Sequence, residues 1–124
     1  MKNMPAVLVV EDESAIAELI AVNLRHNGFR PRWAMDSDSA QREIDDGVPD
    51  LILLDWMLPG ESGLVLAKRW RADPRTKEVP IIMLTANTQA EHVAACREAG
   101  ANRHLGKPFT SAGLFGEIQA VMGH

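Results

Sequence analysis

Residues 50–63, with the sequence DLILLDWMLPGESG, constrain the fold more than any other part of the chain. Four aliphatic residues, 51–54, lead directly into the carboxylate of Asp55, and Pro59, Gly60 and Gly63 follow. A short, unbroken apolar run bounded by turn residues indicates a strand that is buried on both faces, as in a parallel sheet. A parallel strand that ends on an acid places it at the carboxyl edge of the sheet, where open α/β folds bind ligands. Asp55 is therefore the first candidate for a functional residue.

Four further segments have the composition of strands. Residues 6–10 and 79–84 are strong apolar runs, residues 29–34 are a weaker run interrupted by Pro31, and residues 103–106 are a short last strand. Because proline cannot donate to a sheet ladder, Pro31 favours an edge position for its strand.

Helical patterns follow each strand. Ser14 is expected to cap the first helix and Gly28 to end it. Residues 36–39 can cap a short second helix at 40–46, and Ser62 can cap a third. Thr88 and Glu91 have the spacing of a capping box for a fourth helix, whose alanine-rich apolar face predicts weak anchoring. Thr110 or Ser111 is expected to cap the last helix.

Five repeats of strand then helix predict an α/β fold, a doubly wound parallel sheet with helices on both faces. The common five-stranded, flavodoxin-like order is 2-1-3-4-5, which sets the first and third strands side by side. The length of 124 residues suits one domain, 1–124, and we expect any effector domain to lie outside it.

Composition excludes several classes of function. The net charge of -4 argues against nucleic-acid contact by this domain, and no apolar run is long enough for a membrane span. The single cysteine, Cys96, excludes an intrachain disulfide and fits a reducing, cytoplasmic location. We expect Cys96 to be a small core residue, His92 to lie on the surface, and Trp33 and Trp70 to serve packing.

Functional groups follow four of the predicted strands. They are Glu11 with Asp12, Asp55, Thr85 and Lys107. Three carboxylates at one edge of a sheet repel each other unless cations intervene. Lys107 supplies one positive charge, and a few oxygen ligands completed by water suit Mg²⁺ better than Ca²⁺ or Zn²⁺. A carboxylate such as Asp55 can then accept a phosphoryl group, whose oxygens the metal, Lys107 and the Thr85 hydroxyl would neutralise.

At these residues the chain resembles the receiver domain of bacterial response regulators, the CheY-like superfamily of two-component signalling. The matching signals are the acidic pair at 11–12, LLD at 53–55 with Pro59 and Gly63 after it, LTA at 84–86, and KPF at 107–109. The resemblance implies that Asp55 is the phosphoacceptor and that Glu11, Asp12, Asp55 and the backbone carbonyl of Met57 hold Mg²⁺. It implies Thr85 as a switch hydroxyl, a cis bond before Pro108, and a histidine kinase or phosphotransfer protein as partner.

His104 stands where receivers usually carry an aromatic switch residue. Histidine can take that part and add sensitivity to pH, since its pKa lies near neutral. The alternative is an ordinary polar residue on an edge strand.

Two parts of the chain resemble different receivers. The first two-thirds is similar to receivers of OmpR/PhoB-type transcription factors, which dimerise through the fourth helix, fifth strand and fifth helix. The last third is more similar to receivers of hybrid kinases or stand-alone regulators, because Asn102, Arg103, Glu117 and Gln119 depart from the usual charge pairs. The resemblance leaves open whether that dimer forms.

The favoured function is a phosphorylation switch that changes the surface of the fourth helix, fifth strand and fifth helix. Such a domain catalyses its own phosphorylation and dephosphorylation but is not an enzyme with a separate substrate. One alternative is a phosphohydrolase with an aspartyl-phosphate intermediate, although Met57 replaces its usual second acid. Others are a nucleotide or flavin module, disfavoured by acids 11–13, and a receiver-like interaction module that acts without phosphorylation.

Overall fold

Five parallel strands form one sheet in the computed structural model, which describes residues 4–123. The strand order is β2-β1-β3-β4-β5, so the predicted doubly wound, flavodoxin-like topology is confirmed. Residues 1–3 and 124 of the predicted domain lie outside the described part. The strands are β1 (Ala6–Val10), β2 (Arg30–Ala34), β3 (Leu51–Asp55), β4 (Ile81–Thr85) and β5 (Arg103–Gly106).

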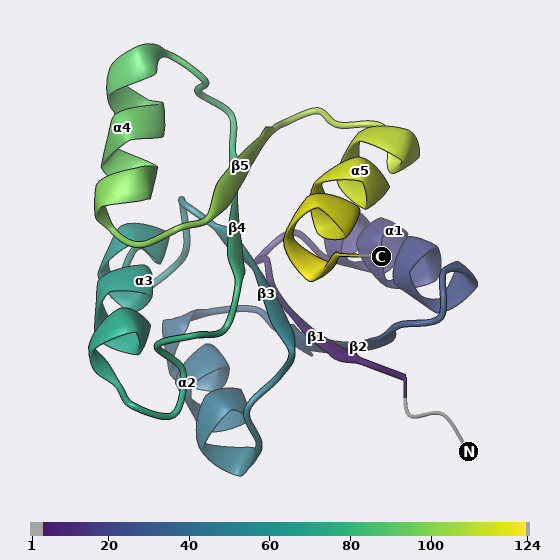
Figure 1. Cartoon of the computed structure of the whole chain (residues 1–124), viewed down its shortest axis with the longest axis horizontal. Helices are drawn as coiled ribbons and strands as arrows, with labels where there is room; N and C mark the ends of the chain where they lie inside the picture. Colours follow the sequence, from purple (N-terminus) through teal and green to yellow (C-terminus); the bar gives the residue numbers. More distant parts are fainter. Residues whose placement is uncertain (1–3, 124) are drawn as a thin grey trace.

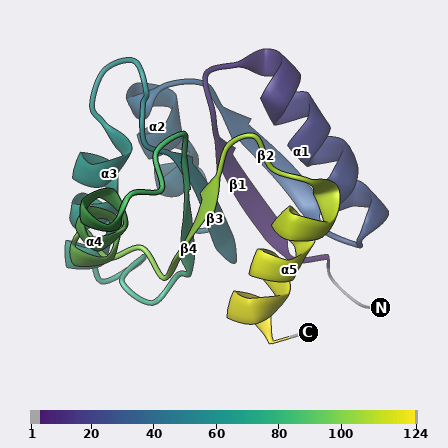
Figure 2. The same cartoon turned by 90° about the horizontal axis from the view of Figure 1, so that it is seen from above.

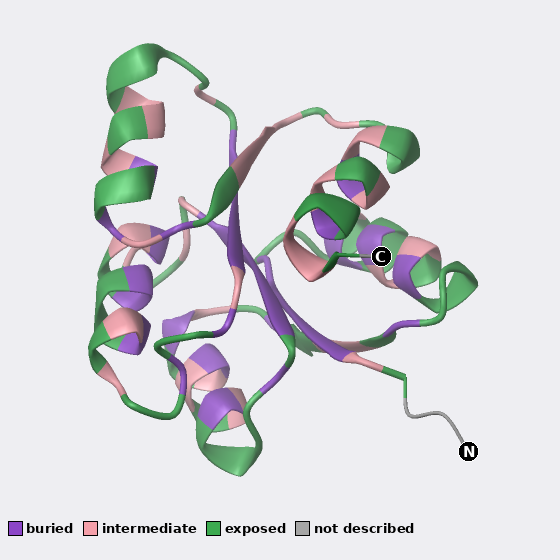
Figure 3. Ribbon diagram, viewed as in Figure 1, coloured by how far each residue is buried: buried purple, intermediate pink, exposed green. Residues whose placement is uncertain are grey.

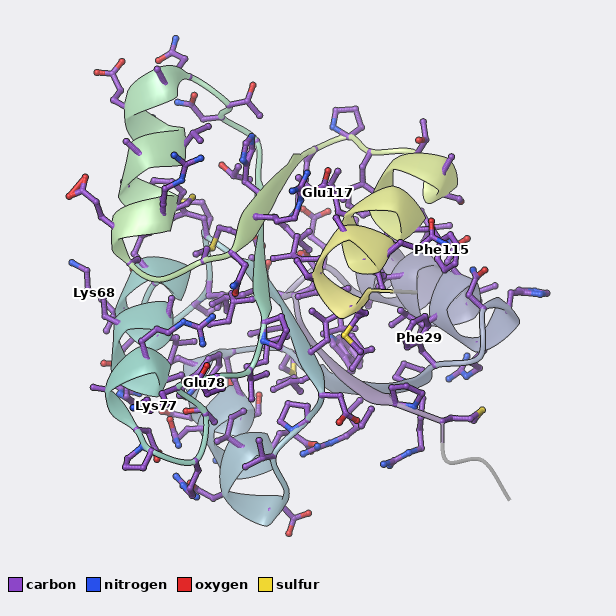
Figure 4. All side chains as sticks on the ribbon, viewed as in Figure 1. Phe29, Lys68, Lys77, Glu78, Phe115 and Glu117 are labelled. Carbon is purple, nitrogen blue, oxygen red and sulfur yellow. The ribbon has the colours of Figure 1, made fainter. Side chains whose placement is uncertain are left out.

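Helices cover both faces of the sheet (Figures 1 and 2). On one face lie α1 (Ser14–His26) and α5 (Ser111–Met122), and on the other lie α2 (Ser37–Asp46), α3 (Gly63–Ala72) and α4 (Ala90–Glu98). Each face has its own apolar cluster, because alternate residues of a strand point to opposite sides. Figure 4 shows Phe115 on the side of α5 toward α1, where it packs with Phe29 in one cluster. Within residues 4–123, no helix has the length and apolarity to cross a membrane.

Burial explains the continuous apolar runs. Every residue of β1, β3 and β4 is buried, since these central strands have helices on both sides (Figure 3). β2 is an edge strand that is only partly buried, and Pro31 lies within it as predicted. The Arg30 backbone NH donates to the Pro5 carbonyl, which lies on the β1 side of the strand. Because successive NH groups of a strand point in opposite directions, residue 31 faces the open edge, where the NH that proline lacks is not needed for pairing.

Side-chain caps position several helix starts. Asp36 and Ser39 form a capping box, so α2 begins at Ser37, three residues before the predicted start at residue 40. Ser62 accepts a hydrogen bond from the Val65 backbone NH, and Thr110 accepts one from Gly113, which confirms both predicted caps.

Two predicted caps are wrong. Ser14 is the first residue inside α1, and the N-cap is Glu13, without a side-chain hydrogen bond. α4 begins at Ala90 with Gln89 as N-cap, so Thr88 and Glu91 do not form a capping box. The Asn87 carboxamide oxygen accepts the Gln89 backbone NH at 2.9 Å, and this local turn delays the helix by one residue.

α4 is the least anchored helix on its face. Its one buried residue is Cys96, and the rest of the helix is largely exposed (Figure 3), as the alanine-rich pattern predicted. α4 is therefore the element that can move at the lowest cost in buried apolar contacts.

Arg71 fastens α3 to the loops beside it. Its guanidinium donates to the carbonyl oxygens of Gly100 at 2.8 Å and Val79 at 2.7 Å, and to Asn102 Oδ1 at 2.7 Å. Asn102 Oδ1 also accepts the Ile81 backbone NH at 2.8 Å. Asn102, which departs from the family charge pattern, therefore joins the starts of β4 and β5 to α3.

Candidate functional site

The carboxyl ends of four adjacent strands meet at one edge of the sheet. Glu11 and Asp12 follow β1, Asp55 ends β3, Thr85 ends β4, and Lys107 follows β5. Glu11, Asp12 and Asp55 each offer one carboxylate oxygen, and these oxygens lie within 4.8 Å of one another. The topology thus brings together the acids that the sequence predicted as one cluster.

Lys107 contacts both buried acids of this cluster. Its Nζ lies 2.8 Å from Glu11 Oε1 and 3.3 Å from Asp55 Oδ2. Burial tends to lower the pKa of the Lys107 ammonium, but the two carboxylates outweigh this effect and leave its pKa raised. Lys107 is therefore a cation throughout the physiological pH range.

The two buried carboxyls bind protons more tightly than free carboxyls do. Burial raises the pKa of Glu11 and of Asp55, whose residues are 0% and 4% exposed, and Lys107 opposes that increase without cancelling it. The like charge of Asp55 raises the Glu11 pKa further, but less than burial does. The loss of hydration on burial is thus the largest effect on the pKa values of these carboxyls, larger than the mutual repulsion expected from the sequence.

The donor set fits a hard divalent cation. Glu11 Oε1 is buried, and although it lies near Lys107 it has no aligned hydrogen-bond donor among the described residues. Asp12 is exposed, so water can complete a coordination shell on that side. Carboxylate oxygens with remaining water ligands are the environment that Mg²⁺ prefers in proteins.

The loop after Asp55 is held against the sheet by its backbone. The Trp56 NH donates to the Leu84 carbonyl at 3.0 Å, and the Gly63 NH donates to the Trp56 carbonyl at 2.9 Å. A Cβ on Gly63 would lie 2.4 Å from the Asp55 carbonyl oxygen, so this position requires glycine. The Met57 NH faces Asp55 Oδ1 at 3.3 Å, while a metal-binding role for the Met57 carbonyl stays a prediction.

Thr85 is buried beside Asp55 but bonded elsewhere. Its hydroxyl donates to the Asn87 carbonyl at 3.1 Å and accepts the Asn87 NH at 3.1 Å. Asp55 is in register with Leu84, the residue before Thr85. Thr85 therefore lies at the carboxyl end of β4 with its single proton engaged by the following loop, and its role as a switch hydroxyl stays a prediction.

His104 is half-buried on the edge strand β5, in register with Met83. It makes no side-chain hydrogen bond to the described residues. The bond between Lys107 and Pro108 is cis, as predicted. The switch role of His104 stays a prediction.

Three residues near the site, Trp33, Ser37 and Asn87, were not predicted to be part of it. The Trp33 indole NH donates to the Glu11 carbonyl at 2.7 Å, so this tryptophan does more than pack. Ser37 Oγ accepts the Glu61 NH at 3.0 Å and joins α2 to the loop after Asp55. The Asn87 carbonyl accepts a hydrogen bond from the Thr85 hydroxyl. The sequence could have indicated this contact, because threonine hydroxyls often bond to the backbone of a residue two positions away.

His92 corrects another expectation, because it is half-buried rather than on the surface. Its ring lies 4.9 Å from that of Trp56, tilted by 44°. The pairing joins the loop after Asp55 to the first turn of α4, two segments that are distant in sequence, so no local pattern could reveal it.

The family model of the response regulator receiver domain matches residues 7–119. The chain belongs to the response regulator receiver family. Over 116 residues it is 44% identical to the phosphate regulon transcriptional regulatory protein PhoB of Escherichia coli, which covers 94% of this chain and 51% of PhoB. The chain thus spans about half the length of such relatives.

Solved receiver structures agree with the fold. CheY4, a chemotaxis response regulator of Vibrio cholerae, superimposes with a TM-score of 0.92 at 30% identity, covering 95% of this chain and 98% of CheY4. The receiver domain of the sensor histidine kinase PA1611 from Pseudomonas aeruginosa has a TM-score of 0.88 at 34% identity, covering 98% and 99%. That structure has a magnesium ion coordinated in its active-site cleft.

Membership in this family defines the general role of the chain. Receiver domains are phosphoacceptor switches of two-component systems and interact with histidine kinases or phosphotransfer proteins. They are not classical enzymes. Receiver domains bind Mg²⁺ in an acidic pocket, and in this chain Glu11, Asp12 and Asp55 form an acidic cluster at the edge of the sheet.

Proposed function

We propose that this receiver is phosphorylated on Asp55 in a reaction that requires Mg²⁺. One observation carries the proposal: Asp55 ends a buried strand with two further acids within 4.8 Å and the Lys107 ammonium at 3.3 Å. This arrangement combines a nucleophile, a cation site and a fixed positive charge at one point.

The phosphodonor is a phosphohistidine of a kinase or phosphotransfer protein. A carboxylate oxygen of Asp55 attacks phosphorus, so that an O–P bond forms and the P–N bond breaks. The electron pair stays on the leaving imidazole nitrogen, which takes a proton. Glu11, Asp12, Asp55 and the Met57 carbonyl would hold Mg²⁺, which neutralises charge on the phosphoryl oxygens when it is bound.

Lys107 and Thr85 then respond to the new charge. Lys107 pairs with a phosphoryl oxygen, and the Thr85 hydroxyl turns to donate to another. The phosphoryl group thereby biases a pre-existing equilibrium between two arrangements of the loop before α4. The surface made by α4, β5 and α5 is the output of this switch, and His104 lies on it within β5.

A homodimer through that surface would lack the charge pairs usual in OmpR/PhoB-type receivers. Arg103 of β5 and Glu117 of α5 form an ion pair within one chain, and Figure 4 shows Glu117 on the side of α5 toward β5. Neither charge is free for the intermolecular pairs usual in OmpR/PhoB-type dimers. We also propose a cytoplasmic location, with any effector domain outside residues 1–124.

The main rival function is a phosphohydrolase that acts on a separate substrate. That chemistry needs a general acid close to the nucleophile. The residue two positions after Asp55 is Met57, which is 76% exposed and has no acidic group. A self-phosphorylating switch is therefore the better fit.

The test is the mass of the intact protein after incubation with acetyl phosphate. Wild type should gain one phosphoryl group with Mg²⁺ and none after chelation. Asp55→Asn should gain none, whereas Asp46→Asn, which changes an exposed acid of α2, should behave as wild type. Absence of an Mg²⁺-dependent gain on wild type would refute the proposal.

A further inference from the structure

We propose that His92 on α4 is a positioning residue that holds the Thr85 hydroxyl away from the phosphoacceptor and ties its release to movement of α4. This inference rests on the proposed phosphorylation of Asp55. Four contacts carry it, and together they lead from the loop after Asp55 through α4 and back to Thr85.

The first contact limits what Thr85 can do. A hydroxyl has one proton to donate, and that of Thr85 is given to the Asn87 carbonyl at 3.1 Å. Thr85 can donate to a phosphoryl oxygen on Asp55 only after it gives up this bond. Any contact that holds Asn87 in place therefore opposes the movement of the Thr85 hydroxyl toward Asp55.

The second and third contacts fix Asn87. Its Oδ1 accepts the Gln89 NH at 2.9 Å, so its Nδ2 faces His92 Nε2 at 3.3 Å as a donor. His92 Nε2 is then the acceptor, which places the ring proton on Nδ1. His92 thus holds the side chain of the residue whose backbone holds Thr85.

The fourth contact ties His92 to the phosphoacceptor loop. Its ring lies 4.9 Å from the ring of Trp56, the residue that follows Asp55. The Trp56 backbone is fixed by hydrogen bonds to Leu84 and Gly63. His92 therefore rests on a rigid surface next to the reacting carboxylate.

The contacts of His92 can be exchanged for others at low cost. His92 Nδ1 is buried and has no hydrogen-bond partner among the described residues, so the present position leaves a donor unsatisfied. His92 lies in the first turn of α4, the helix whose one buried residue is Cys96. When Thr85 releases the Asn87 backbone, Asn87 can move together with His92, and α4 can shift at little cost in packing.

His104 lacks these connections. It lies on β5 in register with Met83 and makes no side-chain hydrogen bond to the described residues. These contacts connect the site to α4 and not to β5, so α4 is the element through which a change at Asp55 reaches the surface.

The test compares His92→Ala with His104→Ala by NMR, with Mg²⁺ and beryllofluoride as the phosphoryl analogue. His92→Ala should bind the analogue about fivefold more tightly than wild type, because Thr85 is released more easily. Its α4 amide shifts on binding should be smaller than in wild type. His104→Ala should match wild type in both respects.

A second variant separates the two contacts of the ring. His92→Phe keeps an aromatic ring beside Trp56 but offers Asn87 no acceptor. It should share the tighter affinity and retain more of the α4 response than His92→Ala. The inference is overturned if His92→Ala binds the analogue as wild type does, or if His104→Ala reproduces its effects.

A measurement without ligand keeps this inference separate from the proposed function. In the free protein, His92→Ala should shift the Asn87 amide resonance more than His104→Ala does, since Asn87 loses a contact. An unchanged Asn87 resonance overturns the positioning role whatever the analogue does. A wild type that fails to respond to Mg²⁺ and the analogue instead refutes phosphorylation of Asp55.

Discussion

Lys107 Nζ lies 2.8 Å from Glu11 Oε1, closer than the 3.3 Å that separates it from Asp55. Without a phosphoryl group, the ammonium mainly compensates Glu11, a buried acid other than Asp55, the proposed phosphoacceptor. Lys107 is therefore a structural cation in addition to its proposed part in phosphorylation, and its removal should affect stability even where no phosphorylation occurs.

Lys107→Met should lower the free energy of unfolding by about 1–3 kcal/mol at pH 7, because two buried carboxylates lose their counter-ion. The loss should be smaller at about pH 4, because Glu11 and Asp55, whose pKa values are raised by burial, are then protonated and need no counter-ion. Urea unfolding at both pH values measures this. Lys68→Met is the matched control, since Lys68 is exposed on α3 and points away from the protein (Figure 4). An equal loss at both pH values would contradict the explanation.

Asp55→Asn should stabilise the metal-free protein. Because the pKa of Asp55 is raised in the folded protein, its carboxyl group stays protonated to a higher pH in the folded state than in the unfolded state. Stability from this group is complete below the unfolded pKa, about 3.9, and is lost as pH rises through the folded pKa. Removing the charge should raise Tm by about 2–5 °C at pH 7 and by less near pH 4. A Tm below that of wild type at pH 7 without metal would be inconsistent with desolvation as the dominant effect.

Mg²⁺ affinity should fall as pH decreases. Protons compete with the metal for Glu11 and Asp55, and the pKa of each is raised by burial. Since Trp56 follows Asp55, its emission should change on Mg²⁺ titration, and the midpoint should move to higher Mg²⁺ as the solution is acidified.

Trp33 and Trp70 require a control in that titration. Trp33 contacts the Glu11 carbonyl, whereas Trp70 is buried and donates to Gln41. Trp33→Phe should preserve the signal, and Trp56→Phe should remove most of it. If Mg²⁺ binds by calorimetry but leaves Trp56 emission unchanged, the proposed closeness of Trp56 to the metal is wrong.

Gly60→Ala should destabilise the loop after Asp55 for two separable reasons. Gly60 has φ +85°, which costs an L-residue about 1–2 kcal/mol, and a Cβ there would lie 2.4 Å from Ser37 Oγ. In a Ser37→Ala background the clash disappears but the backbone strain remains. A double-mutant cycle measured by urea unfolding should therefore show that Gly60→Ala lowers the free energy of unfolding by less in the Ser37→Ala background than in wild type. Simple additivity of the two changes would show that the contact with Ser37 is unimportant.

Strand positions could be predicted because they depend on continuous burial, whereas the sheet order was taken from the order common in five-stranded doubly wound folds. Residues 51–54 are apolar without a break since β3 has helices on both faces, and Pro31 marks β2 as an edge strand. The acidic cluster followed from topology, because parallel strands bring their carboxyl ends together. Helix starts were less predictable. Thr88 and Glu91 had the right spacing for a capping box, but Asn87 bonds Gln89 and moves the start of α4.

The sequence alone determined which chemical groups reach the edge of the sheet: Asp55, its two companion acids, Thr85 and Lys107. Only the tertiary structure decided which of these groups contact one another. It placed Lys107 nearer to Glu11, engaged Thr85 with Asn87, and set His92 against Trp56. The physical reason is that periodicity and turn residues are local properties of the chain. Differences of a few tenths of an ångström in the distances between remote side chains depend instead on how the whole core packs.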